Sequence, residues 1–482
     1  MDLFARKSVA VAALIATSVL GACSSDDNDN GGGGCSADPT APGCQPAAAE
    51  ITADITQNTT WRANTVYTLK GFIKVQPGAT LTIEPGTRIV GDYNTPGSSL
   101  FILPGARIEA RGTAQAPIVF TSSQAVGSRR PGDWGGLILV GKGLVNRGSA
   151  TVPVILEGTG TGPSNPQVNY AGGTDNTDNS GVLSHVRVEF AGYATAPDQE
   201  LNAFTFAAVG SGTQLDHLQV LAGLDDSFEW FGGAADARYL VSYEAGDDHF
   251  DMSEGFQGRL QYLIAYQSGP RLDPRPAAGS PSTDPQGIEN DGCNGSSCNG
   301  GNDATPLTTP VVANFTLVGT GPGVVDATTG GVGAVLRRGT GGYYVNGILA
   351  RWPKAGLSIR DNSTLARLAA GDLLVSNQYL VDNGATFDNA NAIDLAANSI
   401  EVAAAGTAAA SIFTALPASP SAAADLDWSL KAGVAPATGG LATFTGALAI
   451  KAGTAVIPTA YRGAADPSGA KWWAGWTSYA RN

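Results

Sequence analysis

The sequence predicts an all-β fold in which the chain winds into a parallel β-helix, a solenoid of stacked coils. An acidic-aromatic pattern occurs twice, as DDSFEWFGG at 225–233 and as DDHFDMSEG at 247–255. Alternating apolar runs precede both copies, at 218–221 and 239–243, and a third run follows at 260–264. A period in the low twenties, built from short strands and glycine turns without helical spacing, is typical of such a solenoid.

The N-terminus predicts a lipid-anchored, exported protein. Arg6 and Lys7 form a basic start, residues 9–20 are apolar, and the LGAC sequence ending at Cys23 resembles a bacterial lipobox. The apolar run is too short for a stable transmembrane helix. Residues 1–22 are therefore interpreted as a lipoprotein signal peptide, with an ordinary cleaved signal as the alternative. Lipid on Cys23 would anchor the chain to the membrane, and we expect an outer-membrane lipoprotein that faces the periplasm or the cell surface.

Residues 23–50 are rich in Gly, Asp, Pro and Ala and are predicted to be a flexible stalk. With Cys23 assigned to lipid, four cysteines remain, and in an oxidising compartment they are expected to form two local disulfides. The expected pairs are Cys35 with Cys44 and Cys293 with Cys298. The alternative is a four-thiolate metal site, although these spacings suit zinc poorly.

The predicted coils occupy residues 51–360. Short strands at 66–69, 72–75, 81–83 and 88–90 are divided by Pro-Gly turns at 77–78 and 85–86, where proline fixes one dihedral angle and glycine accepts a positive φ. Similar strands continue to residue 359, interrupted by Gly-, Asn- and Pro-rich excursions at 141–181 and 268–310. Residues 361–482 are predicted to be an insertion and a C-terminal cap, since exposed coil ends need covering.

Three segments resemble the opening coils of bacterial lipoproteins with a right-handed parallel β-helix of the pectate lyase-like fold. They are VQPGATLTIEPGT at 75–87, ARGTAQAPIVFTS at 110–122 and GDWGG at 132–136. The acidic repeat and the tryptophan-rich C-terminus are similar to the same group. The resemblance implies the right-handed fold and supplies no catalytic residue.

The acidic repeat is the strongest candidate site. Stacking would place Asp226 over Asp248 and Glu229 over Asp251, about 4.8 Å apart, where two bare carboxylates repel by roughly 3 to 4 kcal/mol at an effective dielectric near 20. Such a ladder is solvated, protonated or bound to a cation, and an excess of oxygen ligands favours calcium. The predicted Ca²⁺ ligands are Asp225, Asp226, Glu229, Asp247, Asp248 and Asp251, with Glu254 and residues 289–291 nearby.

Two other chemical interpretations of these coils stay open. The carboxylates could be the catalytic pair of a glycosidase, or act with calcium and one of the arginines at 238, 259, 271 and 275 in a polysaccharide lyase. The even spacing of the histidines at 185, 217 and 249 could suggest a three-histidine metal site. Their spacing does not match the coil period, however, and ordinary turn hydrogen bonding is the preferred interpretation.

Composition narrows the choice of partner. The formal net charge is −14 and only 15% of the residues are charged, which argues against nucleic acid as a ligand. The sequence therefore predicts a binding or adhesion scaffold in the cell envelope that contacts a polysaccharide or a surface protein. The alternative is an enzyme that cleaves an extracellular glycan.

Overall fold

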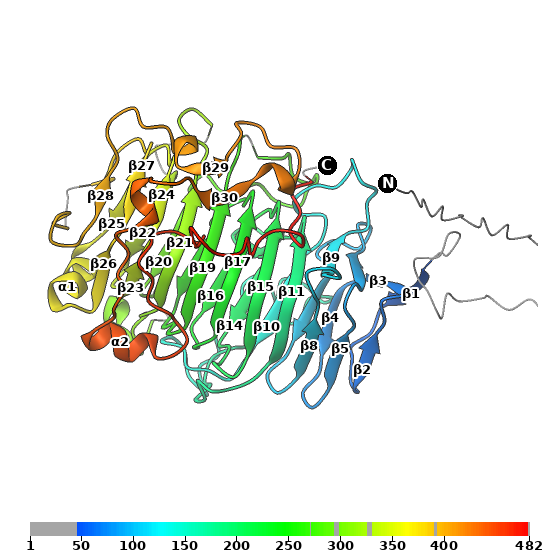
Figure 1. Ribbon diagram of the computed structural model, residues 1–482. Helices are drawn as coiled ribbons and strands as arrows, with labels where there is room; N and C mark the ends of the chain where they lie inside the picture. The colour runs from blue at the N-terminus through cyan, green and yellow to red at the C-terminus, as the bar shows by residue number, and fades with distance from the viewer. Residues whose placement is uncertain (1–45, 270, 294–297, 325–329, 390–392, 481–482) are drawn as a thin grey trace, which may run out of the picture.

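The computed structural model describes residues 46–269, 271–293, 298–324, 330–389 and 393–480. Two long parallel sheets wind around one apolar core, and the predicted right-handed parallel β-helix is confirmed (Figure 1). Between the two ends of the helix, each coil contributes one strand to a nine-stranded sheet and either one bent strand or two short strands to a seventeen-stranded sheet.

The nine-stranded sheet forms one side of the helix. Its members, in spatial order from the N-terminal end, are β4 (Phe72–Val75), β7 (Ser99–Ile102), β10 (Leu137–Val140), β14 (Phe204–Ala207), β16 (Phe228–Phe231), β18 (Phe250–Ser253), β20 (Gln286–Asp291), β22 (Val332–Arg337) and β25 (Ala355–Ile359).

The seventeen-stranded sheet forms the other two sides. Its members are β1 (Ala47–Ile51), β2 (Thr59–Trp61), β3 (Thr65–Leu69), β5 (Thr80–Ile83), β6 (Arg88–Gly91), β8 (Arg107–Arg111), β9 (Ile118–Ser122), β11 (Gly181–Glu189), β15 (Gln214–Leu221), β17 (Asp236–Tyr243), β19 (Arg259–Tyr266), β21 (Val311–Val318), β23 (Gly342–Val345), β24 (Ile348–Ala350), β26 (Leu373–Ser376), β27 (Tyr379–Val381) and β28 (Glu401–Val402).

This sheet turns a corner because one residue in the middle of each long strand takes a left-handed backbone conformation. In β11, β15 and β17 these residues are His185 (φ 49°), His217 (φ 54°) and Tyr239 (φ 61°). The strand pairing continues on both sides of each of them. A left-handed residue bends an otherwise extended chain. Because these residues lie at equivalent positions in neighbouring strands, the same corner repeats from coil to coil.

Large aromatic side chains stack inside the coils. The ring of Phe228 lies 5.2 Å from that of Phe204 and 5.4 Å from that of Phe250, nearly parallel to both. Phe228 therefore lies over Phe250, and the same pairing confirms the predicted register of the acidic residues.

Small elements decorate the helix. Hairpins are formed by β12 (Tyr193–Ala196) with β13 (Gln199–Leu201) and by β29 (Phe413–Ala415) with β30 (Asp427–Leu430). The remaining elements are α1 (Asn362–Ala370), α2 (Gly446–Ala452) and the 3-10 turns η1 (Gly301–Asp303), η2 (Ala409–Ser411), η3 (Ala423–Asp425) and η4 (Ala435–Ala437).

The predicted boundary at residue 360 needs correction, because coils continue beyond it. Strands β26 to β28 stack on β23 and β24, so the last parallel pairing reaches Val402. The chain after α2 then runs back along the outside of the seventeen-stranded sheet rather than across an open end (Figure 1). We call residues 453–480 the strap. Its Trp476 is 1% exposed, so the strap buries an outer face of the coils.

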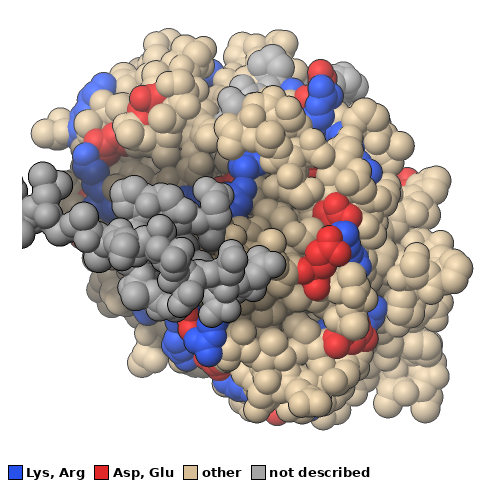
Figure 2. Space-filling view, turned by 90° about the vertical axis from the view of Figure 1, so that its right-hand side faces the viewer, with Lys and Arg blue, Asp and Glu red and all other residues tan. Residues whose placement is uncertain are grey.

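The N-terminal expectations are only partly within the described residues. The first strand begins at Ala47, slightly before the predicted start at residue 51. Cys293 and Cys298 form the expected disulfide, whereas Cys23, Cys35 and Cys44 lie outside the described residues. Among the described helices, none has the length and apolar character needed to cross a membrane. Charged side chains are sparse on the N-terminal end of the helix, in keeping with the composition (Figure 2).

Candidate cation site

The candidate site is a column of carboxylates on the outer side of the nine-stranded sheet. Alternation along β16 and β18 sends Phe228, Trp230 and Phe250 into the core, so Glu229 and Asp251 face outward. The pairing register puts Glu229 beside Asp251 and Asp251 beside Glu289 of β20. The predicted stacking of Glu229 over Asp251 is confirmed, and Glu289 extends the column by one coil.

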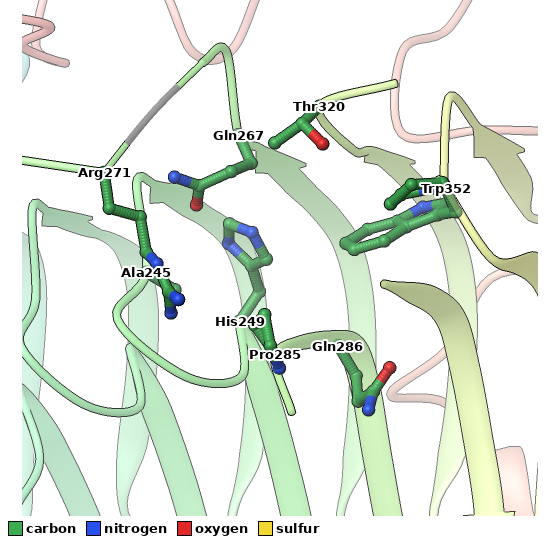
Figure 3. A pocket seen from close by; sticks show the side chains of 9 residues that line it. Ala245, His249, Gln267, Arg271, Pro285, Gln286, Thr320 and Trp352 are labelled. Carbon is green, nitrogen blue, oxygen red and sulfur yellow. The ribbon is translucent and has the colours of Figure 1, made fainter. Parts of the chain in front are cut away.

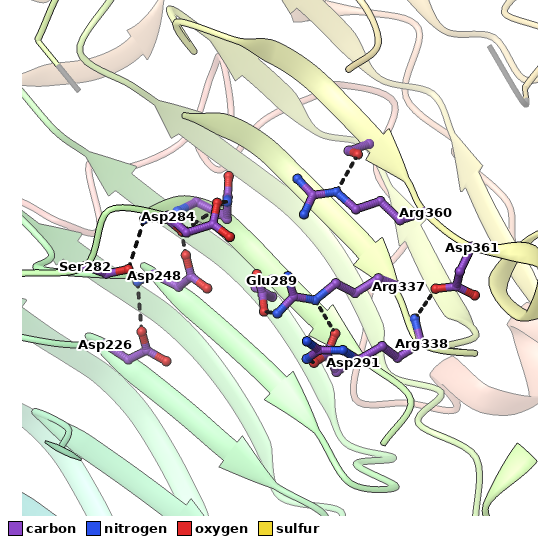
Figure 4. Close-up of polar contacts among 12 residues, drawn as sticks. Asp226, Asp248, Ser282, Asp284, Glu289, Asp291, Arg337, Arg338, Arg360 and Asp361 are labelled. Atoms are coloured by element: carbon purple, nitrogen blue, oxygen red, sulfur yellow. Dashed lines mark hydrogen bonds and ion pairs between the residues drawn. The ribbon is translucent and has the colours of Figure 1, made fainter. Parts of the chain in front are cut away.

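The turns before β16 and β18 add a second set of carboxylates. Asp226 accepts a hydrogen bond from the backbone N–H of Asp248 at 2.8 Å, and Asp248 accepts one from the backbone N–H of Gln286 at 2.5 Å. Figure 4 shows Asp226 and Asp248 in successive coils, with Asp284 above them. Each of these two aspartates therefore holds the turn of the next coil, which is a structural role independent of any ligand.

The two sets meet in three overlapping groups of acids. In each group, one carboxylate oxygen per residue lies within 4.8 Å of the others, close enough for a shared ion. The groups are Asp225 with Asp226 and Asp247, Asp226 with Glu229 and Asp251, and Asp248 with Asp251 and Glu289. All six residues predicted as ligands belong to them, and Asp226 and Asp251 each belong to two groups.

Burial makes this concentration of negative charge costly. Asp226 and Glu229 are each 6% exposed, and Asp248 is 3% exposed. Loss of hydration, followed by repulsion from neighbouring carboxylates, raises the pKa values of these three groups well above the usual range. The same causes raise the pKa of Glu289 to about 8. Burial, reinforced by Asp284, raises the pKa of Asp247 to about 7.

Arginines from a later coil neutralise one end of the column. Arg337 of β22 forms ion pairs with Glu289 and, at 2.8 Å, with Asp291, and Arg338 forms a further ion pair with Asp291 (Figure 4). Both arginines were missed in the sequence because they lie far beyond these acids along the chain. The loop before β21 makes the length of this coil irregular. The position of the two arginines beside the acids therefore becomes visible only from the pairing of β20 with β22.

The other end of the column is covered by the excursion at residues 141–181. Arg147 forms an ion pair with Glu254, and the Tyr170 hydroxyl donates a hydrogen bond to the same carboxylate. Glu254 lies near the ladder, as expected, since its charge adds to the burial that raises the pKa of Glu229, but Arg147 and Tyr170 already engage its two carboxylate oxygens. Glu157 of the same excursion is a partly buried acid missed by sequence analysis, and loss of hydration followed by repulsion from Glu200 raises its pKa to about 7.

Two carboxylate oxygens in the middle of the column accept no hydrogen bond from any residue that the structure describes. They are Oδ1 of Asp247 and Oδ1 of Asp251, both shielded from solvent. A buried acceptor without a donor is unfavourable, and a proton or a cation would satisfy it. The oxygen-only donor set fits calcium, which takes six to eight oxygen ligands in irregular geometry. The described acidic groups can thus bind a metal ion.

The four candidate arginines are dispersed. Arg238 and Arg259 lie on the seventeen-stranded sheet, away from the column, and pair with Asp216 and Asp236. Arg271 approaches Asp247 but donates to backbone carbonyls, including that of Ser282 at 2.7 Å. Arg275 packs over the ring of Tyr93 at 4.3 Å. Within the described chain, none of the four forms an ion pair with a member of the three acidic groups.

The three histidines do not form the shared metal site that their even spacing could suggest. The spacing does match the coil that carries the β12–β13 hairpin, since β11 pairs with β15 in that register, and His185 stacks on His217 at 4.3 Å. The interpretation that this spacing is not a coil length is therefore wrong for this pair. His249 belongs to another side of the helix, so the three histidines form no common site.

His249 lines a small cavity on the C-terminal side of the acidic turn (Figure 3). Its Nδ1 shares a hydrogen bond of 2.6 Å with the Ser242 hydroxyl, which donates to the Ser227 hydroxyl at 2.7 Å. Both serines are fully buried, and burial lowers the pKa of His249 to about 3. The imidazole is therefore neutral and holds two coils together. No substrate could reach either serine as a nucleophile.

Comparison with known proteins identifies the fold family. No curated protein and no solved structure matches the chain. The family model of the pectate-lyase like beta helix domain matches residues 53–425, which include every strand of both long sheets from β2 to β28. The chain therefore belongs to the pectate-lyase like beta helix domain family.

Proposed function

We propose that this protein is a binding scaffold of the bacterial cell envelope, anchored by lipid on Cys23, and that its acidic column binds Ca²⁺. The observation that carries the cation proposal is the shielded Oδ1 of Asp251, which accepts no hydrogen bond although Asp251 belongs to two of the three acidic groups. The LGAC sequence supports the anchor and the outer-membrane location.

The carboxyl groups of the column outnumber the arginines that pair with them, so a cation could take the place of the protons that the raised pKa values imply. The three acidic groups contain seven different carboxyl groups, and the ion pairs with Arg337 engage only the Glu289 end. At an effective dielectric near 20, each adjacent pair of ionised carboxylates one coil apart repels by roughly 3 to 4 kcal/mol. A divalent ion between Asp226, Glu229 and Asp251 would reverse the sign of these interactions and satisfy the free oxygen.

A scaffold is favoured over an enzyme by the surroundings of the column. Asp226 and Asp248 hold backbone turns, and Asn202 donates a hydrogen bond to Glu229, so these side chains are committed to the fold. The nearest guanidinium, that of Arg337, is held by two carboxylates and is poorly placed to act as a base. We therefore assign the column a stabilising role that keeps the coils rigid for contacts elsewhere.

The second candidate is a calcium-dependent polysaccharide lyase or a glycoside hydrolase. The observation in its favour is the pKa of Asp247 at about 7, which would let this carboxyl group exchange a proton near neutral pH. Incubating the protein with acidic and neutral polysaccharides and measuring new reducing ends tests this candidate. Cleavage that disappears in the Asp247→Asn variant would replace the scaffold proposal.

Isothermal titration with CaCl₂ tests the cation proposal directly. The full-length protein in detergent, first stripped with EDTA, is expected to bind Ca²⁺ with release of protons, because raised pKa values leave part of the column protonated. The Asp251→Asn variant is expected to lose most of the binding heat. Unchanged binding in that variant, or no binding by the wild type, would contradict the proposal.

A further inference from the structure

An open groove lies on the seventeen-stranded sheet, away from the acidic column. It is on the side formed by the first halves of the long strands β11, β15 and β17. Its volume is about 530 Å³, and its floor is the outer face of β11, β15 and β17. The strand register forms a row across four coils, from Arg111 through Ser184 and Asp216 to Arg238. A second row contains Gln214 and Asp236, with Arg259 beside them.

The groove is open because the apolar cover of this side ends before it. Further along the helix, Val311 and Tyr343 on the same side are buried under Leu448 and Ala452 of α2. Only Ala455, just past α2, borders the groove. The floor is accordingly apolar where the helix covers it and polar where it is open.

The arginines of the floor present their charge outward. In the pair of Arg238 with Asp216, the arginine side chain is 58% exposed and the aspartate 26%, at 2.8 Å from Nε to Oδ2. In the pair of Arg111 with Glu109, the values are 60% and 22%. In each pair the carboxylate is the less exposed partner and holds the guanidinium group by an ion pair. A ligand would therefore meet positive charge first, on a chain whose net charge is −14.

The remaining groups suit a hydroxylated polymer better than a peptide. Ser184, Ser211 and Gln214 add hydroxyl and amide groups to the lining. The backbones of β11, β15 and β17 are paired on both sides within the sheet, so a peptide could not add as a further strand. Arg111 and Arg238 are three coils apart, about 14 Å, so one ligand that reaches both must extend along the helix axis.

We propose that this groove binds a linear acidic polysaccharide, whose carboxylate or sulfate groups pair with Arg111 and Arg238. Guanidinium groups bind such anions through two parallel hydrogen bonds. The bond of Arg259 to Asp236, through both Nε and Nη2, orients a third guanidinium group at the edge. The groove is a second site, distinct from the acidic column, and its ligand binding needs no Ca²⁺.

Binding of full-length protein in detergent to polygalacturonate, dextran sulfate, neutral dextran and polyglutamate tests the proposal, with EDTA present throughout. The wild type is expected to bind at least one acidic polysaccharide and to bind it more weakly as salt rises, while neutral dextran does not bind. Arg238→Gln and Arg111→Gln are each expected to weaken binding at least tenfold. Arg62→Gln, which removes another exposed, ion-paired arginine outside the groove, is the matched control.

Asp216→Asn separates this proposal from a role for the carboxylates. It is expected to preserve or strengthen binding, because the asparagine oxygen can still accept the hydrogen bond from Nε of Arg238 while the negative charge beneath it is removed. Equal affinities of Arg238→Gln and wild type, or stronger binding to polyglutamate than to either acidic polysaccharide, would overturn the proposal. Unchanged thermal unfolding of each variant shows that the coils are intact. Since EDTA is present throughout, failure of the Ca²⁺ proposal leaves this result interpretable.

Discussion

Replacing Asp251 by asparagine should change the stability of the protein in opposite directions without and with calcium. Asp251 lies between Glu229 and Glu289 in the column, one coil from each. Each repulsion is worth roughly 3 to 4 kcal/mol when both partners are ionised, at an effective dielectric near 20. Glu289, with a pKa of about 8, is half protonated at pH 8. Burial, followed by repulsion from Glu289, raises the pKa of Asp251 as well, so this pair contributes at most about 2 kcal/mol of repulsion at that dielectric, which Asp251→Asn removes in EDTA.

Calcium should reverse the order of the two proteins. A ligand at one hundred times its dissociation constant stabilises the folded state by about 2.7 kcal/mol. The wild type should gain this amount, whereas Asp251→Asn, which lacks a carboxylate shared by two acidic groups, should gain little. Differential scanning calorimetry at pH 8 should thus show the variant melting above the wild type in EDTA and below it in saturating CaCl₂.

Asp273→Asn is the control, since it removes one negative charge from an exposed residue and should shift neither comparison. If Asp251→Asn melts below the wild type in EDTA, the column is not repulsive and the electrostatic reasoning fails. If calcium raises both melting temperatures equally, Asp251 is not a ligand.

Three further predictions concern pH and packing. In EDTA, the free energy of unfolding should fall as pH rises from 5 to 9. The raised pKa of Glu289 gives stability that is fully present below its usual value of 4.5 and is lost as pH passes about 8. Chemical denaturation at each pH measures this, and a free energy of unfolding that rises with pH would contradict it. Trp476→Ala should cost about 3 kcal/mol or more and loosen the strap, which hydrogen exchange of residues 453–480 would report; unchanged protection there would refute the assigned role. Gly181→Ala should destabilise the protein by about 1 to 3 kcal/mol, because φ is 116° and the new Cβ would lie 1.9 Å from the Ile108 carbonyl oxygen, whereas Gly162→Ala, with open space around it, should melt like the wild type.

Much of the candidate site could be predicted because stacked coils turn sequence periodicity into spatial neighbours. The constant offset between two similar segments was enough to superimpose Phe228 on Phe250 and Glu229 on Asp251. The alternation of apolar and acidic residues then decided which of them face outward. Where coils have constant length, the offset between two repeats in the sequence gives the register of their strands.

The register of the strands cannot be obtained from sequence offsets where loops change the coil length. The partnership of Glu289 with Arg337, the stacking of His185 on His217 and the approach of Arg147 to Glu254 all cross excursions of irregular length. The strap was expected to cover an end of the helix, yet it lies along a side, where Gln219 exchanges two hydrogen bonds with Ser478. Such contacts depend on how segments far apart in the chain pack, which no local pattern encodes.

By itself, the sequence determined the parallel β-helix, the direction in which each side chain of the acidic repeat points, and the concentration of carboxylates on one side, since all three follow from the alternation along a strand and from a regular coil length. Only the tertiary structure decided which of those carboxylates are relieved by arginines, which oxygens remain without a donor, and that a separate groove exposes guanidinium groups. The electrostatic potential and the solvent exposure at a given atom depend on neighbours from the whole chain, and irregular loops determine which residues those neighbours are.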